Sequence, residues 1–115
     1  MEKSPEEKYV DYHEQELYKK ALQYWGRHAQ IDMMIEEASE LIVALQHYKR
    51  YLLNHPINEY NREYGEHVCE EIADTQIMLN QMKLIFSKAD VAKYRYKKLE
   101  RLVERILSYL GSEKK

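Results

Sequence analysis

Residues that interrupt helices are scarce in this chain. Only three glycines and two prolines occur among 115 residues, and turns and sheets would require more of both, together with more valine and threonine. Hydrophobic residues make up 44% of the chain and charged residues 33%, which allows a modest core at this length. These features predict a single all-α domain over residues 1–115.

Capping and breaking residues divide the chain into four predicted helices. Ser4, Pro5 and Glu7 form a helix start, because serine caps, proline fits the first turn and glutamate completes a capping box. We expect this N-terminal helix, within residues 1–26, to end at Gly26. The other three helices are expected over residues 27–53, 59–86 and 90–110, with Asp90 as the cap of the last one. Residues 112–115 are expected to form a frayed tail.

Four helices with short connections predict an antiparallel bundle, or hairpins that complete a four-helix bundle by pairing with a second copy. The expected second helix is apolar around much of its circumference, because Met33, Val43 and Ala44 lie off its main stripe. One small bundle cannot cover every side of such a helix. The eleven tyrosines favour the same conclusion, since tyrosine is enriched at interfaces. We therefore expect a homodimer or a homotetramer.

Charge and hydropathy exclude several kinds of partner. The net charge of −2 and the isoelectric point near 6.2 provide no field that would attract a nucleic-acid polymer. No segment approaches the roughly 18 apolar residues of a membrane span, and the acidic, polar N-terminus differs from a secretory signal. Cys69 is the only cysteine, which fits a reducing compartment. These features predict a cytoplasmic protein without a membrane partner.

Two acidic motifs, EEASE and EEIAD, stand on neighbouring predicted helices. Each contains two carboxylates three residues apart, Glu37 with Glu40 and Glu71 with Asp74, and this spacing places each pair on one helix face. Like charges at this spacing repel by roughly 0.2–0.5 kcal/mol, so neither pair stabilises its helix. A divalent cation bound between the carboxylates would replace this repulsion with a net attraction. Four hard oxygen ligands suit Mg²⁺.

Helix periodicity places part of this acidic set beside the predicted core. The apolar stripe of the expected third helix consists of Val68, Ile72, Thr75, Leu79, Met82 and Phe86. The stripe of the second consists of Ile31, Met34, Ile35, Ala38, Leu41, Ile42 and Leu45. Glu37 flanks its stripe, and Glu71 and Asp74 fall roughly 60° and 120° from theirs. A carboxylate drawn out of water needs a cation or a donor, which makes ordinary solvated charges the weaker interpretation.

The sequence resembles the MazG-like nucleoside triphosphate pyrophosphohydrolases. The resemblance rests on EExxE followed by ExxD in a short all-α chain, on the lead-in Trp25–Ile35, on residues 77–82, and on Lys98–Leu102 in the last helix. It covers about residues 20–105. The spacer at 41–70 is at the long end for the family, and the extra residues fall in a predicted loop, so the helical registers are intact.

The resemblance implies a MazG-like bundle that hydrolyses a nucleoside triphosphate, usually a deoxy or non-standard one, to the monophosphate and pyrophosphate with Mg²⁺ or Mn²⁺. Carried over by position, the metal ligands are Glu37, Glu40, Glu71 and Asp74. Glu36 matches the leading glutamate of the motif and would contact the metal through water or orient the attacking water. Without a metal, four acids would repel a triphosphate, so the implied enzyme requires one.

Substrate contacts are expected from four further residues. Lys98 and Arg101, one turn apart on the last helix, match the basic pattern of the family and would hold pyrophosphate, whereas pairing with neighbouring acids is the alternative. Trp25 is a candidate to stack on the base, with plain core packing as the alternative. Gln30 is a candidate hydrogen-bond partner, with simple exposure to water as the alternative.

Two other kinds of protein are alternatives to a pyrophosphohydrolase. Di-iron bundles need a Glu-x-x-His motif, and none of the five histidines stands three residues after a glutamate. A non-catalytic helical interaction or regulatory protein remains as the alternative function. Such a protein has no use for partly buried carboxylates, so the acidic motifs distinguish it from an enzyme.

Overall fold

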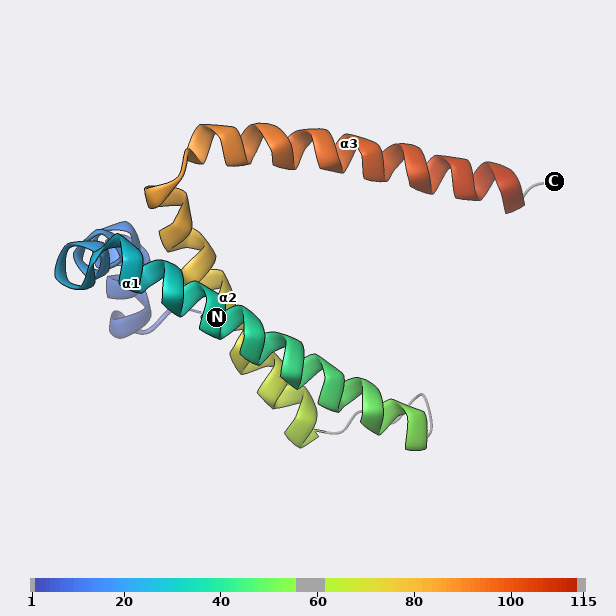
Figure 1. Ribbon diagram of the computed structural model, residues 1–115, viewed down its shortest axis with the longest axis horizontal. Coiled ribbons are helices and arrows are strands. Elements are labelled where there is room, and N and C mark those ends of the chain that lie inside the picture. The colour runs from blue at the N-terminus through green and yellow to red at the C-terminus, as the bar shows by residue number, and fades with distance from the viewer. Residues whose placement is uncertain (1, 56–61, 114–115) are drawn as a thin grey trace. The chain divides into compact units, whose positions relative to one another are not determined.

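The computed structural model describes residues 2–55 and 62–113, and within these residues it contains three α-helices and no strand (Figure 1). The helices are α1 (Pro5–Asn54), α2 (Arg62–Ile85) and α3 (Lys88–Glu113). The all-α prediction is confirmed. None of the helices in the described ranges is both long and apolar enough to cross a membrane.

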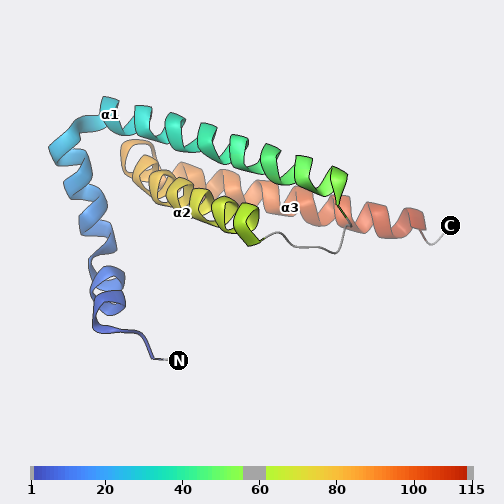
Figure 2. The same cartoon turned by 90° about the horizontal axis from the view of Figure 1, so that it is seen from below.

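α1 begins as the capping signals predict and bends sharply at Gly26. The Ser4 hydroxyl oxygen accepts a hydrogen bond from the backbone N–H of Glu7 at 3.1 Å, and Pro5 is the first helical residue. Gly26 has φ 87° and ψ 161°, a backbone conformation that is essentially restricted to glycine. Gly26 therefore interrupts the helix and redirects it (Figure 2), so the predicted helix boundary at Gly26 is confirmed, and α1 consists of two helical segments joined at this bend. We call residues 5–25 the N-terminal arm.

α2 runs antiparallel to the part of α1 that follows the bend and packs against it (Figures 1 and 2). Two contacts define the register between α1 and α2. The Thr75 hydroxyl lies 3.4 Å from the carbonyl oxygen of Glu37 near the middle, and the rings of Tyr51 and Tyr64 lie 5.6 Å apart toward one end. This helical hairpin brings the two acidic motifs opposite each other. The expected helix start at Glu59 lies outside the described residues.

The N-terminal arm is tied to α2 through Tyr18. Its side chain is buried, and its hydroxyl donates to Glu14 Oε1 at 2.5 Å and accepts from Asn80 Nδ2 at 3.4 Å. Burial is the main cause that raises the pKa of Tyr18, and the hydrogen bond to Glu14 raises it further. The phenol is therefore neutral and can act as a donor to the carboxylate.

The surface between α1 and α2, which we call the seam, is largely polar. Its buried side chains are Gln30, Ala44, Glu71, Thr75, Met78 and Gln81. By contrast, apolar side chains assigned to the core by periodicity are widely exposed, at 60% for Ile35, 57% for Ile42 and 47% for Leu79. The predicted apolar stripes are therefore only partly buried: Thr75 is buried and Met34 is half-buried, whereas the three residues just named are exposed. Periodicity identifies an apolar face, but it does not determine which neighbour covers that face.

The chain consists of two compact units, Met1–Ile85 and Phe86–Lys115, and α3 forms the second. Ser87 caps α3, because its hydroxyl oxygen accepts from the backbone N–H of Asp90 at 3.1 Å. The predicted cap at Asp90 is therefore wrong. Asp90 instead lies in the first turn, where its negative charge interacts favourably with the positive end of the helix dipole. α3 continues through Gly111, and only residues 114–115 of the expected frayed tail lie outside the described ranges.

Candidate metal centre

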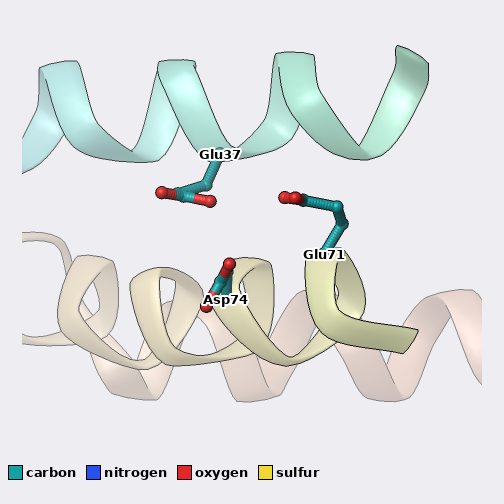
Figure 3. A group of neighbouring side chains, drawn as sticks. All are labelled: Glu37, Glu71 and Asp74. Atoms are coloured by element: carbon teal, nitrogen blue, oxygen red, sulfur yellow. The ribbon is translucent and has the colours of Figure 1, made fainter. Parts of the chain in front are cut away.

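Three carboxylates from two helices converge in the seam. Glu37 projects from α1, and Glu71 and Asp74 project from α2 toward it (Figure 3). One oxygen from each of the three lies within 4.8 Å of the others. The spacing of three residues places Glu71 and Asp74 on one face of α2, and the antiparallel register brings Glu37 opposite them. Sequence spacing predicted this convergence for three of the four expected ligands.

Two of these carboxylates lack partners for buried oxygens. Glu71 is 7% exposed and Glu37 is half-buried, whereas Asp74 is exposed. The Oε2 atoms of Glu37 and Glu71 are buried without a hydrogen-bond partner, and Gln81 Oε1 is the only other such side-chain atom among the described residues. All three atoms are acceptors. No hydrogen-bond donor reaches these three oxygens, and an unpaired buried carboxylate is costly.

Burial is the main reason that the carboxyl pKa values rise at this site. Burial raises the pKa of Glu37, and the charges of Glu40 and Asp74 raise it further. Burial likewise raises the pKa of Glu71, with additional contributions from Glu40 and Asp74, while the charge of His67 opposes the rise. Protons therefore bind these carboxylates more readily than they bind ordinary glutamates. A divalent cation would compete with those protons for the same oxygens.

Thr75 fixes the backbone beneath the three carboxylates. Its hydroxyl donates to the carbonyl oxygen of Glu71 at 2.7 Å and lies 3.4 Å from that of Glu37. The side chain is buried, so one hydroxyl touches the backbone of both helices at the point where their acids meet. Periodicity assigned Thr75 to an apolar stripe and missed this role.

The other expected acids lie at the edge of the cluster. Glu40 is exposed and lies outside the group of three, but its charge raises the pKa of both Glu37 and Glu71. Glu36 is exposed, and its charge acts on Glu37. Both side chains are therefore close enough to influence the centre, although neither supplies one of its converging oxygens.

The residues expected to contact substrate have different surroundings. Gln30 is 4% exposed, so the alternative that it faces water is wrong. Trp25 is 67% exposed beside the bend, so the alternative that it packs in the core is wrong within this chain. Lys98 and Arg101 are exposed on α3, one turn apart.

Gln81 is a buried polar residue of the seam that sequence reasoning missed. It stands seven residues after Asp74, and two helical turns return to nearly the same face. Gln30 stands seven residues before Glu37 on the antiparallel helix. The same spacing of seven on both helices was a usable signal that these two amides lie on the helix faces that carry the acids.

A cluster of carboxylate oxygens with unsatisfied buried atoms can bind a hard cation or share protons. Shared protons would satisfy the oxygens only below the raised pKa values of Glu37 and Glu71. A cation would satisfy them over the whole neutral range. No protein-family model, curated protein or solved structure matches this chain.

Proposed function

We propose that the chain is a metal-dependent hydrolase that converts a nucleoside triphosphate to the monophosphate and pyrophosphate. The observation that carries the proposal is the convergence of Glu37, Glu71 and Asp74 within 4.8 Å, with buried oxygens that have no donor. A protein with no use for a cation gains nothing from this arrangement, because burial and mutual repulsion both disfavour the charged carboxylates.

The donor set fits Mg²⁺, with Mn²⁺ as a substitute, because all of its atoms are hard carboxylate oxygens. Glu37, Glu71 and Asp74 would hold the ion, and Glu40 would join them as a fourth ligand from the edge of the cluster. A bound Mg²⁺ would neutralise phosphate charge and lower the pKa of a coordinated water.

The remaining residues supply proton transfer and binding. Hydrolysis forms a bond between the water oxygen and the α-phosphorus and breaks the bond to the pyrophosphate oxygen. A carboxylate of the cluster accepts the proton from water, and Glu36 orients that water. Lys98 and Arg101 are the cations proposed for the released pyrophosphate. Trp25 is exposed enough to stack on a base, whereas Gln30 would contact substrate only from within the seam.

We further propose that a second copy completes a four-helix, MazG-like bundle over the hairpin, giving a homodimer or a homotetramer. Ile35 follows the half-buried Met34 by one position, and Ile72 follows Glu71 of the seam by one position. Each step turns the side chain by about 100°. Because the helices are antiparallel, these two rotations place Ile35 and Ile72 on the same side of the hairpin. An apolar face built from two helices requires a cover.

The test is ³¹P NMR of the purified protein with a panel of canonical and modified deoxynucleoside triphosphates, in Mg²⁺ and in EDTA. We expect monophosphate and pyrophosphate in Mg²⁺, and neither product in EDTA or in Glu71→Gln. Glu70→Gln is the matched control, because it removes an adjacent but exposed charge. Release of inorganic phosphate would contradict attack at the α-phosphorus. No turnover of any nucleotide would contradict the enzyme proposal.

The second candidate is a non-catalytic interaction protein, and the exposed apolar side chains of the hairpin favour it. Both candidates predict assembly, so assembly cannot separate them. For an interaction protein, Glu71→Gln should stabilise the fold and Mg²⁺ should have no effect. For the hydrolase, the same change should abolish both turnover and the stabilisation by Mg²⁺.

A further inference from the structure

A second candidate site lies at the end of the hairpin that is remote from the bend. A hollow of about 450 Å³ opens there between the last turns of α1 and the start of α2. Its lining residues are His47, Arg50, Tyr51, Asn54, His55 and Tyr64. The volume lies within the range of small-molecule sites, which is about 300–1,000 Å³.

The side chains that line this hollow are rich in hydrogen-bond donors. They comprise one guanidinium, two imidazoles, one amide and two phenols, and no carboxylate is among these six residues. No ion pair within the described residues engages the guanidinium of Arg50. A guanidinium presents a planar fork of donors that matches a phosphate group.

Contacts between neighbouring side chains hold the walls of the hollow in place. His55 Nδ1 donates to the carbonyl oxygen of Tyr51 at 2.9 Å, and the two rings stack with centroids 4.0 Å apart. The ring of Tyr64 meets that of Tyr51 from α2 at 5.6 Å. Asn54 Nδ2 donates to the carbonyl oxygen of Arg50 at 3.2 Å. These contacts fix the rings and the amide that surround Arg50 and His47, and they engage the Nδ1–H of His55 and one N–H of Asn54.

The charge of the hollow is opposite to that of the unit that carries it. Residues 1–85 contain nine Lys and Arg against sixteen Asp and Glu, a net charge of −7. An anion would therefore approach this unit only at a locally positive point. His47 stands seven residues after Glu40, which is a rise of about 10 Å along the helix. The hollow is thus separate from the acidic cluster.

We propose that this hollow binds the phosphate group of a small phosphorylated ligand without a metal ion. Arg50 supplies the fork of donors, and His47 supplies a further donor. Inorganic pyrophosphate and a nucleoside monophosphate carry the same chemistry, and both would bind. The proposal is independent of the hydrolase activity, since neither catalysis nor Mg²⁺ enters it.

The experiment is a titration of the full chain in EDTA, followed by the ¹H NMR signals of the histidine rings, with His47→Gln and His55→Gln to assign them. The probes are pyrophosphate, adenosine monophosphate and adenosine. We expect saturable shifts of the His47 and His55 signals with the first two probes and none with adenosine. In Arg50→Gln the affinity should fall roughly tenfold, as expected for the loss of a charge-assisted hydrogen bond.

Lys49→Gln is the matched control, because it removes the same charge from the neighbouring exposed position, and its affinity should stay within about twofold of the original. Equal losses of affinity in Lys49→Gln and Arg50→Gln would mean that the probes are held by nonspecific electrostatic attraction, and this result would overturn the proposal. Binding of adenosine as tight as that of its monophosphate would mean a ring site, and the absence of any saturable shift would mean no site. Circular dichroism confirms that each variant remains helical.

Discussion

At the scale of single residues, the buried carboxylates make stability depend on pH. Because burial raises the pKa of Glu37 and Glu71 above the ordinary 4.5, the folded state keeps protons that the unfolded chain has released. Without metal, the free energy of unfolding should therefore fall as pH rises from about 4.5 through the raised pKa values, and then level off. Urea unfolding in EDTA across this range measures the slope. Glu71→Gln should flatten the slope and Glu70→Gln should not.

Metal removal is the complementary prediction. Mg²⁺ at about 100 times its dissociation constant should stabilise the folded protein by about 2.7 kcal/mol, because it binds oxygens that exist as a group only after folding. Thermal melts with Mg²⁺ and with EDTA measure the difference. In Glu71→Gln the difference should vanish, and turnover should be lost as it is in EDTA. Equal stabilisation of both proteins would place the cation elsewhere.

Thr75 provides a third prediction at this scale. Thr75→Val keeps the shape of the side chain but removes the hydroxyl that donates to Glu71 and touches the backbone of Glu37. The expected loss is about 1 kcal/mol of unfolding free energy. Thr75→Ser keeps the hydroxyl and is the control. Equal stability of Thr75→Val and the original protein would show that this hydroxyl does not help to hold the helices together.

The sequence predicted the acids of this site better than their neighbours. Spacing alone brought Glu71 and Asp74 to one face, and the motif on the preceding helix supplied Glu37. The roles of Thr75 and Gln81 were missed because periodicity marks a helix face without showing whether an apolar or a polar neighbour covers it. Their roles depend on the rotation of one helix against the other, which only the register between helices determines.

At the scale of elements, Gly26 controls the direction of the N-terminal arm. Its φ of 87° and ψ of 161° strain any other residue, although no atom lies within 4 Å of an added Cβ. Gly26→Ala should therefore cost about 1–3 kcal/mol through backbone strain alone. Gly111→Ala is the control, because it lies in regular helix and should stabilise α3 by roughly 0.5–1 kcal/mol. Urea unfolding of both variants tests the difference.

The start and end of α1 and the end of α2 were predicted to within one residue, whereas both ends of α3 were wrong and the faces between helices were predicted only in part. Ser4, Pro5 and Glu7 carry local signals that act within one turn, so the start of α1 agrees with the capping rules. The end of α3 extended past Gly111 because a single glycine in an otherwise favourable helix costs only about 1 kcal/mol. Packing faces depend on partners that are distant in sequence, and local pattern does not identify them.

At the scale of the whole molecule, the apolar face of the hairpin predicts assembly. Sedimentation should give a mass that is a multiple of 14.0 kDa. The double change Ile42→Glu and Leu79→Glu places charges on that face and should shift the protein to monomer, because an unpaired charge in an apolar interface costs several kcal/mol. Gln23→Glu adds a charge at an exposed polar position of the N-terminal arm and is the control. A monomeric original protein would contradict the prediction.

The contact between Tyr18 and Asn80 has a consequence for how the chain is made. The two residues are 62 positions apart, and a ribosome adds about 5–20 residues per second. The N-terminal arm therefore waits roughly 3–12 seconds after its own synthesis before the residue that holds it exists. Until then Tyr18 has no partner on α2, so the arm docks only after nearly all of the hairpin has been made.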